Sequence, residues 1–278
     1  MHPGVRVVAP LLVVILTTAV RAQEVQPSPA PSLTDAYRLF YNARYEEAAA
    51  LALTLRASGS QDLENDEVRT SALLFELRGL LNGQDARDND NKSEKSETLK
   101  RCAKCSEVMA AFMADLHHGQ ALARSRLKSS PTDQEALFFL GKLDLNYVWL
   151  ELGLLGHKTG WDEYWEARKS LDAVLKQNPN HVRARVARGW IDYIVNTRMP
   201  WGTRWILGGG NKKRGLASVR EASIMEADAW TRAEAEFALW DMNVREKNFR
   251  DATVIAQRLG RQFPENREVA KFLATRVP

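Results

Sequence analysis

The stretch WDEYWEARKSLDAVLKQNPNHVRARVARG, residues 161–189, decides the fold expected for this chain. Its apolar residues recur at helical spacing, the Asn-Pro step at Pro179 breaks the pattern, and a second helical pattern follows. Tyr164 stands three residues before Ala167, and Gly189 stands ten residues after Pro179. Small residues let two helices approach closely, an aromatic ring fills the space beside them, and proline ends the pair. The stretch therefore predicts paired helices.

The same spacing recurs elsewhere and marks further pairs of helices. It is found at Tyr45/Ala48, Phe249/Ala252/Pro264 and Pro131/Gly141. After residue 32 no stretch alternates apolar and polar residues convincingly, so the chain is predicted to be all-α. We expect helices at 33–41, 45–56, 67–81, 109–128, 134–152, 161–177, 182–196, 212–225, 227–245, 249–263 and 265–275.

From residue 33 onward the chain resembles tetratricopeptide repeat (TPR) proteins of the exported bacterial type, in about five units. The matching residues are Tyr164-x-x-Ala167…Pro179, Phe249-x-x-Ala252…Pro264, and Leu140-Gly141 after Pro131. The resemblance implies an α-solenoid of antiparallel helix pairs, wound as a right-handed superhelix. It also implies binding of a peptide or protein in the concave groove, without catalysis.

The repeat spacing exceeds the TPR period at one recurring point, between the two helices of a pair. Pro131 and Pro179 lie 48 residues apart, which places 14 extra residues after Gly141, and 17 extra residues follow Gly189. A third insertion is expected in a polar loop at about 83–107. Insertions at one point of stacked repeats project from one edge, so we expect all three to crowd along a single rim.

The insertions are rich in tryptophan and basic residues. Four of the eight tryptophans fall there, and paired Trp and Arg are typical of binding hot spots. The partner-binding candidates are Trp161, Trp165, Trp201, Arg204 and Trp205. The alternative is that these tryptophans pack the lengthened helices against each other.

Two acidic residues interrupt apolar helix faces at equivalent places, Asp144 three residues after Gly141 and Asp192 three residues after Gly189. Such positions face the inner surface in TPR folds, so by resemblance both are candidates for lining a partner-binding groove. The alternative is that each is hydrogen-bonded between neighbouring helices.

A glycine run before a basic helix start suggests a weak anion-binding site. Free backbone N–H groups and helix N-termini attract anions, whereas the spacing of a phosphate loop is absent. The alternative is a flexible turn before a solvated basic face. The candidate residues are Gly209, Gly210, Lys212, Lys213 and Arg214.

Cys102 and Cys105 form a Cys-x-x-Cys, for which a disulfide is the default in an exported protein. A zinc site with His117 and His118, or a redox pair, stays open as an alternative, although no fourth ligand stands at regular spacing. Since no catalytic motif occurs in the chain, we expect no catalytic residues, no metal site and no cofactor.

The N-terminus predicts export. A basic residue, an apolar run at 7–20 and small or apolar residues before position 23 form a signal-peptide pattern, residues 1–22, which is too short for a membrane span. A Pro-rich leader, 23–32, precedes the helical region, 33–278. We expect a periplasmic or secreted protein with no transmembrane segment after cleavage.

Composition bounds the class of partner. Hydrophobic residues make up 45% of the chain and charged residues 27%, which is typical of a folded protein. Without the signal peptide, which contains two arginines, 39 − 2 = 37 basic residues face 35 acidic ones. This near-balance argues against nucleic-acid binding. We expect a protein or peptide partner in the cell envelope, with two rivals: a small-molecule or lipid-binding component similar to TPR proteins of periplasmic solute transport, and a metal or redox protein.

Overall fold

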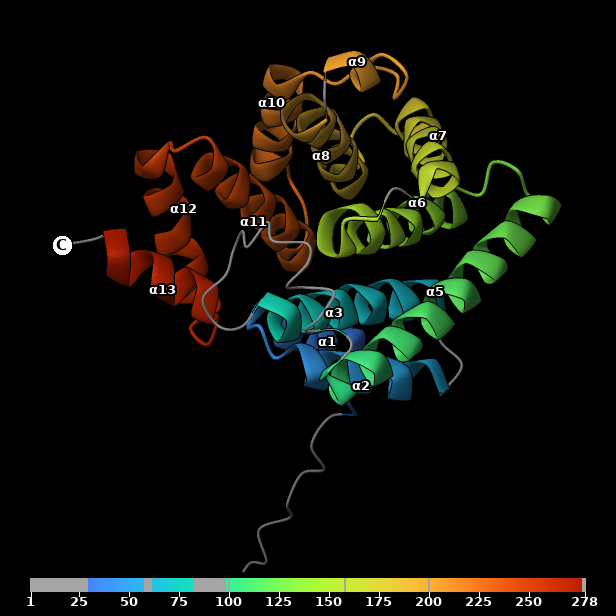
Figure 1. The fold of residues 1–278 in the computed structure, drawn as a ribbon, viewed down its shortest axis with the longest axis horizontal. Coiled ribbons are helices and arrows are strands. Elements are labelled where there is room, and N and C mark those ends of the chain that lie inside the picture. The colour runs from blue at the N-terminus through green and yellow to red at the C-terminus, as the bar shows by residue number, and fades with distance from the viewer. Residues whose placement is uncertain are drawn as a thin grey trace, which may run out of the picture. The chain divides into compact units, whose positions relative to one another are not determined.

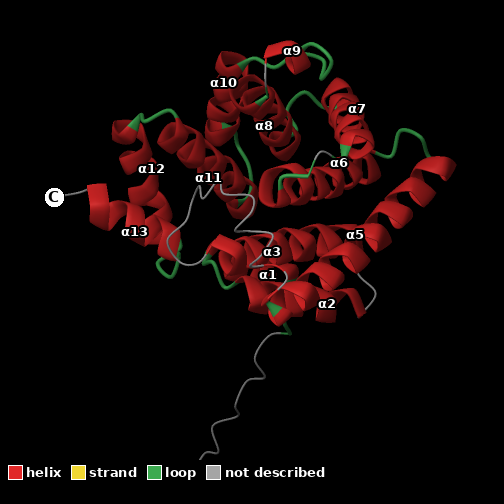
Figure 2. Ribbon diagram, viewed as in Figure 1, coloured by secondary structure: helices red, strands yellow, loops and turns green. Residues whose placement is uncertain are grey.

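The computed structural model describes residues 30–57, 62–82, 99, 101–157, 159–199 and 201–276. Within these ranges all regular structure is helical, which confirms the all-α prediction, and no strand occurs (Figure 2). Residues from Pro31 onward belong to one compact unit. The expected signal peptide, most of the Pro-rich leader and residues 83–98 of the expected polar loop lie outside the described residues.

The helices pack in adjacent pairs, as the spacing predicts (Figure 1). The pairs are α1 (Leu33–Tyr41) with α2 (Tyr45–Ala57), α3 (Asp62–Asn82) with α5 (Ala103–Ser129), α6 (Gln134–Val148) with α7 (Trp161–Gln177), α8 (Val182–Arg198) with α10 (Lys212–Ile224), and α11 (Ala229–Arg245) with α12 (Phe249–Gln262). The remaining elements are the π-helix η1 (Trp149–Leu155), the short α9 (Trp201–Arg204) and the final α13 (Arg267–Arg276).

Two helices begin earlier in the structure than the sequence predicts. The helix α5 begins at Ala103, inside the expected polar loop, because Cys102 caps it by accepting a hydrogen bond from the Cys105 N–H. The helix α3 begins at Asp62, five residues before the expected start. The turn α9 was not expected at all.

Side-chain caps explain where several helices start. Asp133 accepts a hydrogen bond from the Ala136 N–H before α6, and Asn211 accepts one from the Arg214 N–H before α10. Asp228 accepts from the N–H groups of Trp230 and Thr231 before α11. Each cap satisfies donors that the helix itself leaves without a partner.

The small residues lie where paired helices cross. A Cβ atom at Gly189 would stand 3.0 Å from the carbonyl oxygen of Gly215, and a Cβ at Gly141 would stand 2.9 Å from the Leu171 side chain. Ala167 is fully buried in the α6–α7 contact region. Only glycine permits the backbones of α8 and α10 to approach this closely.

The first and last pairs also contact each other. The Asn266 side chain donates a hydrogen bond to the Tyr41 carbonyl oxygen at 2.8 Å, and the Glu265 N–H donates to Asn42 Oδ1 at 3.1 Å. The rings of Tyr41 and Phe263 lie 5.3 Å apart between centroids. The turn before α13 is therefore fastened to the end of α1.

Candidate functional site

The insertion between α8 and α10 folds back onto α7. The Tyr164 hydroxyl donates a hydrogen bond to the Leu207 carbonyl oxygen at 2.8 Å, and the Leu207 side chain is buried beside it. Arg168 donates to the carbonyl oxygens of Leu207 and Gly208, both at 2.9 Å. One guanidinium thus holds the loop against the start of α7, since hydrogen bonds from a charged donor are the strong ones.

Large apolar side chains remain exposed around this anchor. Trp161 is 38% exposed, Trp165 42%, Trp205 75% and Ile206 55%. We call these four residues the tryptophan rim. Trp205 is largely exposed, whereas Trp161 and Trp165 are more than half covered. Trp165 lies edge-on to Tyr164, with the Arg168 guanidinium over its ring. A binding role for these tryptophans stays a prediction. The side chain of Trp201 lies outside the described residues.

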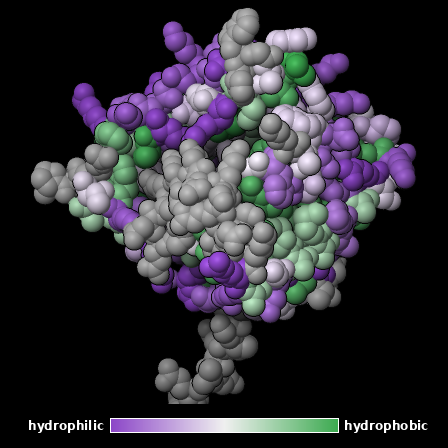
Figure 3. All heavy atoms as spheres, in the orientation of Figure 1, coloured by the Kyte–Doolittle hydropathy of each residue, from purple (hydrophilic) through white to green (hydrophobic). Residues whose placement is uncertain are grey.

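The rim combines apolar and basic character. The segment 198–214 contains five basic and no acidic residues. Arg204 lies within it and donates to the Met199 carbonyl oxygen at 2.9 Å, which closes the turn. Figure 3 shows hydrophilic residues at the upper left of the molecule and hydrophobic and near-neutral residues further right along the same margin. A partner of this surface must accommodate rings and positive charge together.

The insertion between α6 and α7 is built as a π-helix and a tight loop. Gly156 and Gly160 have φ of 71° and 86°, values that favour glycine. Glu151 accepts hydrogen bonds from His157 and Thr159, at 2.9 and 2.5 Å, which fixes the loop before Trp161.

The insertions lie close to one another where the structure describes them. Leu150 and Leu154 of η1 belong to the same apolar cluster as Leu81 and Cys105, which flank the expected polar loop. The loop that follows α9 packs on the first turns of α7. These contacts agree with insertions that share one edge.

The expected anion-binding residues are engaged within the protein. The N–H groups of Gly208 and Gly209 donate to the carbonyl oxygens of Trp205 and Arg204, at 3.1 and 2.8 Å. The carbonyl groups of this loop face Arg168, so the loop binds a cation of its own chain. The Gly209 N–H is therefore already engaged, and the anion-binding nest at Gly209 and Gly210 stays a prediction.

The basic residues of that expected site are also engaged where the structure gives partners. Lys212 donates to Glu246 at 2.7 Å, and Arg214 donates to Asp192 through two nitrogens at 2.7 and 3.0 Å. Lys213 is exposed. Gly210 lies so close to α8 that a Cβ would stand 2.8 Å from the Asp192 carbonyl oxygen.

Asp144 and Asp192 occupy helix interfaces and do not line an open groove. Asp144 is fully buried and accepts a hydrogen bond from the Gln120 side chain at 2.7 Å. Asp192 is buried and accepts hydrogen bonds from Arg214. It also forms an ion pair with Arg188 at 2.8 Å. Both residues therefore fit the alternative given by the sequence, in which each is hydrogen-bonded between neighbouring helices.

The two buried carboxyl groups differ in charge preference. Burial raises the pKa of Asp144 to about 8, and the nearby Glu166 adds to the effect. Burial alone would also raise the pKa of Asp192, but hydrogen bonds from Arg214 and Arg188 outweigh it and lower that pKa. The difference arises because Asp144 accepts its hydrogen bond from a neutral amide, with the Arg124 guanidinium only at 3.8 Å, whereas Asp192 bonds to two guanidinium groups.

Cys102 and Cys105 are joined by a disulfide bond in the structure. Their sulfur atoms are therefore not free thiolates for the metal or redox alternatives. His118 Nδ1 lies 2.7 Å from Asp66, and among the described residues no group of three or more His, Cys, Asp or Glu could hold a metal ion.

A buried charge cluster that sequence reasoning missed lies among the first helices of the pairs. Arg183 donates to Glu234 at 2.6 Å and to Glu67 at 2.8 Å. Lys142 donates to Glu234 at 2.5 Å and lies 3.4 Å from Glu67. Glu64 completes the group by accepting from Tyr37. We call Lys142, Arg183, Glu64, Glu67 and Glu234 the central charge cluster.

The cluster joins side chains from α3, α6, α8 and α11. Burial would lower the pKa of Arg183, but Tyr37, Glu234 and Glu67 outweigh it and raise that pKa well above its usual value. Glu67 and Arg183 stand 116 residues apart in sequence, so no local pattern signals their contact.

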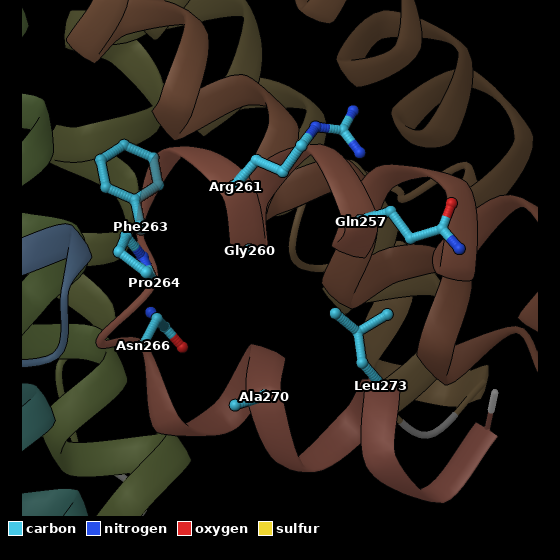
Figure 4. Close-up of a pocket in the computed structure, with 8 residues that line it drawn as sticks. All are labelled: Gln257, Gly260, Arg261, Phe263, Pro264, Asn266, Ala270 and Leu273. Carbon is cyan, nitrogen blue, oxygen red and sulfur yellow. The ribbon is translucent and has the colours of Figure 1, made fainter.

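A hollow of about 500 Å³ lies between α12 and α13. Ala270 and Leu273 point from α13 toward it, and Phe263 lies at its other end (Figure 4). Its lining is mostly apolar or neutral, with Arg261 as the charged member, so it offers no set of groups for catalysis.

None of the described helices is long and apolar enough to cross a membrane. No protein-family model, curated protein or solved structure matches the chain.

Proposed function

We propose that this chain is an exported, non-enzymatic scaffold of the TPR type, which binds a protein or peptide partner in the cell envelope through the tryptophan rim. In this proposal residues 1–22 form the signal peptide, 23–32 the leader, and 33–278 a right-handed superhelix of helix pairs. The single observation that carries the binding function is the exposure of Trp161, Trp165, Trp205 and Ile206 around a rigid anchor.

The repeat assignment is supported by the pairing of helices and by their crossings. The close approach at Gly141 and at Gly189 falls at equivalent places in two pairs. The central charge cluster draws on the first helices of four pairs, as expected when first helices share one inner surface. Because those inner side chains bond to each other, the proposal assigns the partner to the rim and not to the concave groove.

Export is supported by two independent features. The N-terminal sequence has the signal-peptide pattern, and the disulfide between Cys102 and Cys105 suits an oxidising compartment. A reducing cytoplasm would keep such a pair as thiols.

The chemistry of the rim indicates the kind of partner surface. Tryptophan and isoleucine provide large rigid contact area, and Arg204 and Lys213 of the segment 198–214 add positive charge, whereas Lys212 and Arg214 are already paired with Glu246 and Asp192. A complementary partner face carries an apolar pocket bordered by Asp or Glu. Electrostatic attraction of that kind speeds association and weakens as salt rises.

Affinity capture from envelope extract tests the proposal when wild type is compared with the double variant Trp161→Ala/Trp205→Ala. The matched control is Ile224→Ala, since Ile224 is 82% exposed at the other end of α10. We expect a partner that wild type and the control recover and the rim variant loses. For the purified partner, the rim variant binds about 30-fold more weakly, as two hot-spot truncations predict.

Recovery of the same proteins by all three forms would contradict the assignment of the rim. Binding to anionic lipid vesicles, lost in the rim variant and accompanied by no protein partner, would instead make the rim a membrane-surface contact and overturn the protein-binding proposal. Equal melting temperatures of the three forms exclude misfolding as the cause.

A further inference from the structure

A pocket of about 240 Å³ lies where α3, α8 and α11 begin, against one face of α1. Its walls include the rings of Tyr37, Tyr41 and Trp230 and the carboxylates of Glu64 and Asp228. Arg183 forms part of its floor. The pocket is separate from the tryptophan rim, because no rim residue lines it.

The aromatic walls present nearly parallel faces. The ring centroids of Tyr37, Tyr41 and Trp230 lie 6.3 to 6.4 Å apart, and the planes of Tyr41 and Trp230 differ by 2°. A cation placed over such faces is attracted by the negative charge of the π-systems. Apolar surface with a few convergent polar groups is also the usual composition of a small-molecule site.

The charges around the pocket are out of balance. The carboxylates Glu64 and Asp228 line it, and Glu67 and Glu234 lie directly behind. The cations in contact with this group are Arg183 and Lys142, so four negative charges face two positive ones. Arg232, further along α11, is exposed and donates to the Ala227 carbonyl oxygen. An additional cation would restore neutrality in a partly desolvated site, where unbalanced charge is costly.

Arg183 does not serve as an anchor for an anion, because its guanidinium is already occupied. It donates to Glu67, Glu234 and the Tyr37 hydroxyl, at 2.8, 2.6 and 3.3 Å. Its carbon Cζ lies 5.0 Å from the centre of the Phe138 ring, which covers it from another side. Glu64 Oε1 accepts from the Tyr37 hydroxyl at 2.8 Å and lies 3.8 Å from Arg183, and Asp228 Oδ1 caps α11. The second oxygens of these two carboxylates, Glu64 Oε2 and Asp228 Oδ2, are therefore the groups to which we assign the ligand.

We propose that this pocket binds a small alkylammonium ion, with the charged nitrogen at Glu64 and Asp228 and the alkyl part against Trp230 and Tyr41. The volume limits the ligand to something smaller than drug-sized molecules, which occupy roughly 300–1,000 Å³. This inference goes beyond the partner-binding function and uses other residues, so either can fail alone.

Isothermal titration of the full chain with choline and with n-butylammonium tests the proposal and separates quaternary from primary ammonium ligands. The neutral analogue of choline, 3,3-dimethylbutan-1-ol, has similar shape without the charge. We expect one site per chain for at least one ammonium, with the neutral analogue at least about tenfold weaker, because the charged interaction is absent.

Glu64→Gln removes one carboxylate charge at nearly constant shape, and we expect it to weaken ammonium binding at least about tenfold. Asp228→Asn is a second variant, since asparagine still caps α11 while the charge is lost. The matched control is Glu221→Gln on α10, which removes an exposed carboxylate paired with Arg185 and leaves affinity unchanged.

The proposal is overturned if neither ammonium binds at about 10 mM, where a ligand with a millimolar Kd saturates the site. It is also overturned if the alcohol binds as well as choline, if both pocket variants keep full affinity, or if acetate binds in place of the ammonium ions. Retained ammonium binding in Trp161→Ala/Trp205→Ala separates this site from the rim.

Discussion

The central charge cluster and the tryptophan rim reverse the usual distribution of residue types. Charged side chains such as Arg183 and Glu234 lie inside and bond to each other, while Trp205 and Ile206 face solvent. Buried charges persist only when paired, and exposed large apolar groups mark surfaces that contact something else. The comparison teaches that the central charge cluster holds helices together, whereas the tryptophan rim makes few contacts of its own and, in the proposed function, is the surface used for recognition.

The largest expected effect comes from removing one cation of the central charge cluster. Arg183→Met leaves Glu67 and Glu234 buried without their guanidinium partner, and we expect the free energy of unfolding to fall by about 3–5 kcal/mol. Urea unfolding followed by circular dichroism measures it. Arg185→Met, two residues along α8 and paired with Glu221, is the control and costs less than about 1 kcal/mol. Equal losses would show that the cluster is not special.

Two tryptophan substitutions compare a buried position with an exposed one by their effect on the free energy of unfolding. Trp240 is 4% exposed and packs edge-on against Phe237 and Phe272, so Trp240→Ala should cost about 3–5 kcal/mol through the cavity it leaves. Trp205→Ala should change the unfolding free energy by less than about 0.5 kcal/mol. A large loss at Trp205 would mean that this ring packs within the fold, and the recognition surface would lose its best residue.

Removing the Arg168 side chain tests whether its hydrogen bonds hold the loop of the tryptophan rim in place. Arg168→Ala removes the donor that binds the carbonyl oxygens of Leu207 and Gly208. We expect a loss of about 1–2 kcal/mol, because the side chain is partly exposed. Amide hydrogen exchange at 203–210 should become faster while exchange in α11 stays unchanged. Unchanged exchange in the loop would indicate that Tyr164 alone holds it.

The smallest expected effect concerns a buried carboxyl outside the cluster. The folded-state pKa of Asp144 is about 8 and the unfolded value is near 3.8, so ionisation is disfavoured in the folded protein. This group's contribution to stability is therefore greatest below pH 4, decreases as pH rises, and is constant above pH 8. Asp144→Asn cannot ionise, and it still accepts from Gln120.

Urea unfolding of wild type and Asp144→Asn at pH 4 to 8 measures this difference. The variant should gain at least about 1.4 kcal/mol relative to wild type over that range, equivalent to one pKa unit. The same substitution at Asp192 should give a nearly flat profile between pH 4 and 8, because the Arg188 and Arg214 bonds lower that pKa and move its pH dependence below about pH 4. Parallel pH profiles for both variants would contradict the contrast between the two sites.

The helices and their pairing could be predicted because they rest on local signals. Helical spacing, caps such as Asp133, and the small residues at Gly141 and Gly189 each act within one pair. The lengthened connections located Trp161 and Trp165, but the sequence could not decide between packing, which is the commoner case for tryptophan, and partner binding.

The remaining features depend on contacts between distant segments. The bonds of Asn266 to Tyr41 and of Arg183 to Glu67 join separate pairs, and no sequence interval encodes them. The bonds from Arg168 of α7 to the carbonyl oxygens of Gly208 and Gly209 are of the same kind, since no spacing within the loop indicates them. α9 has four residues, too few for periodicity to reveal.

The most direct test of the rim as the partner-binding surface is site-specific photo-crosslinking in living cells. A photoreactive phenylalanine analogue replaces Trp205 in one strain and Ile224 in another, two exposed apolar positions at opposite ends of α10 and its preceding loop. The account predicts one discrete crosslinked partner from position 205 and none from position 224. The same products from both positions, or a partner captured from position 224 alone, would contradict it.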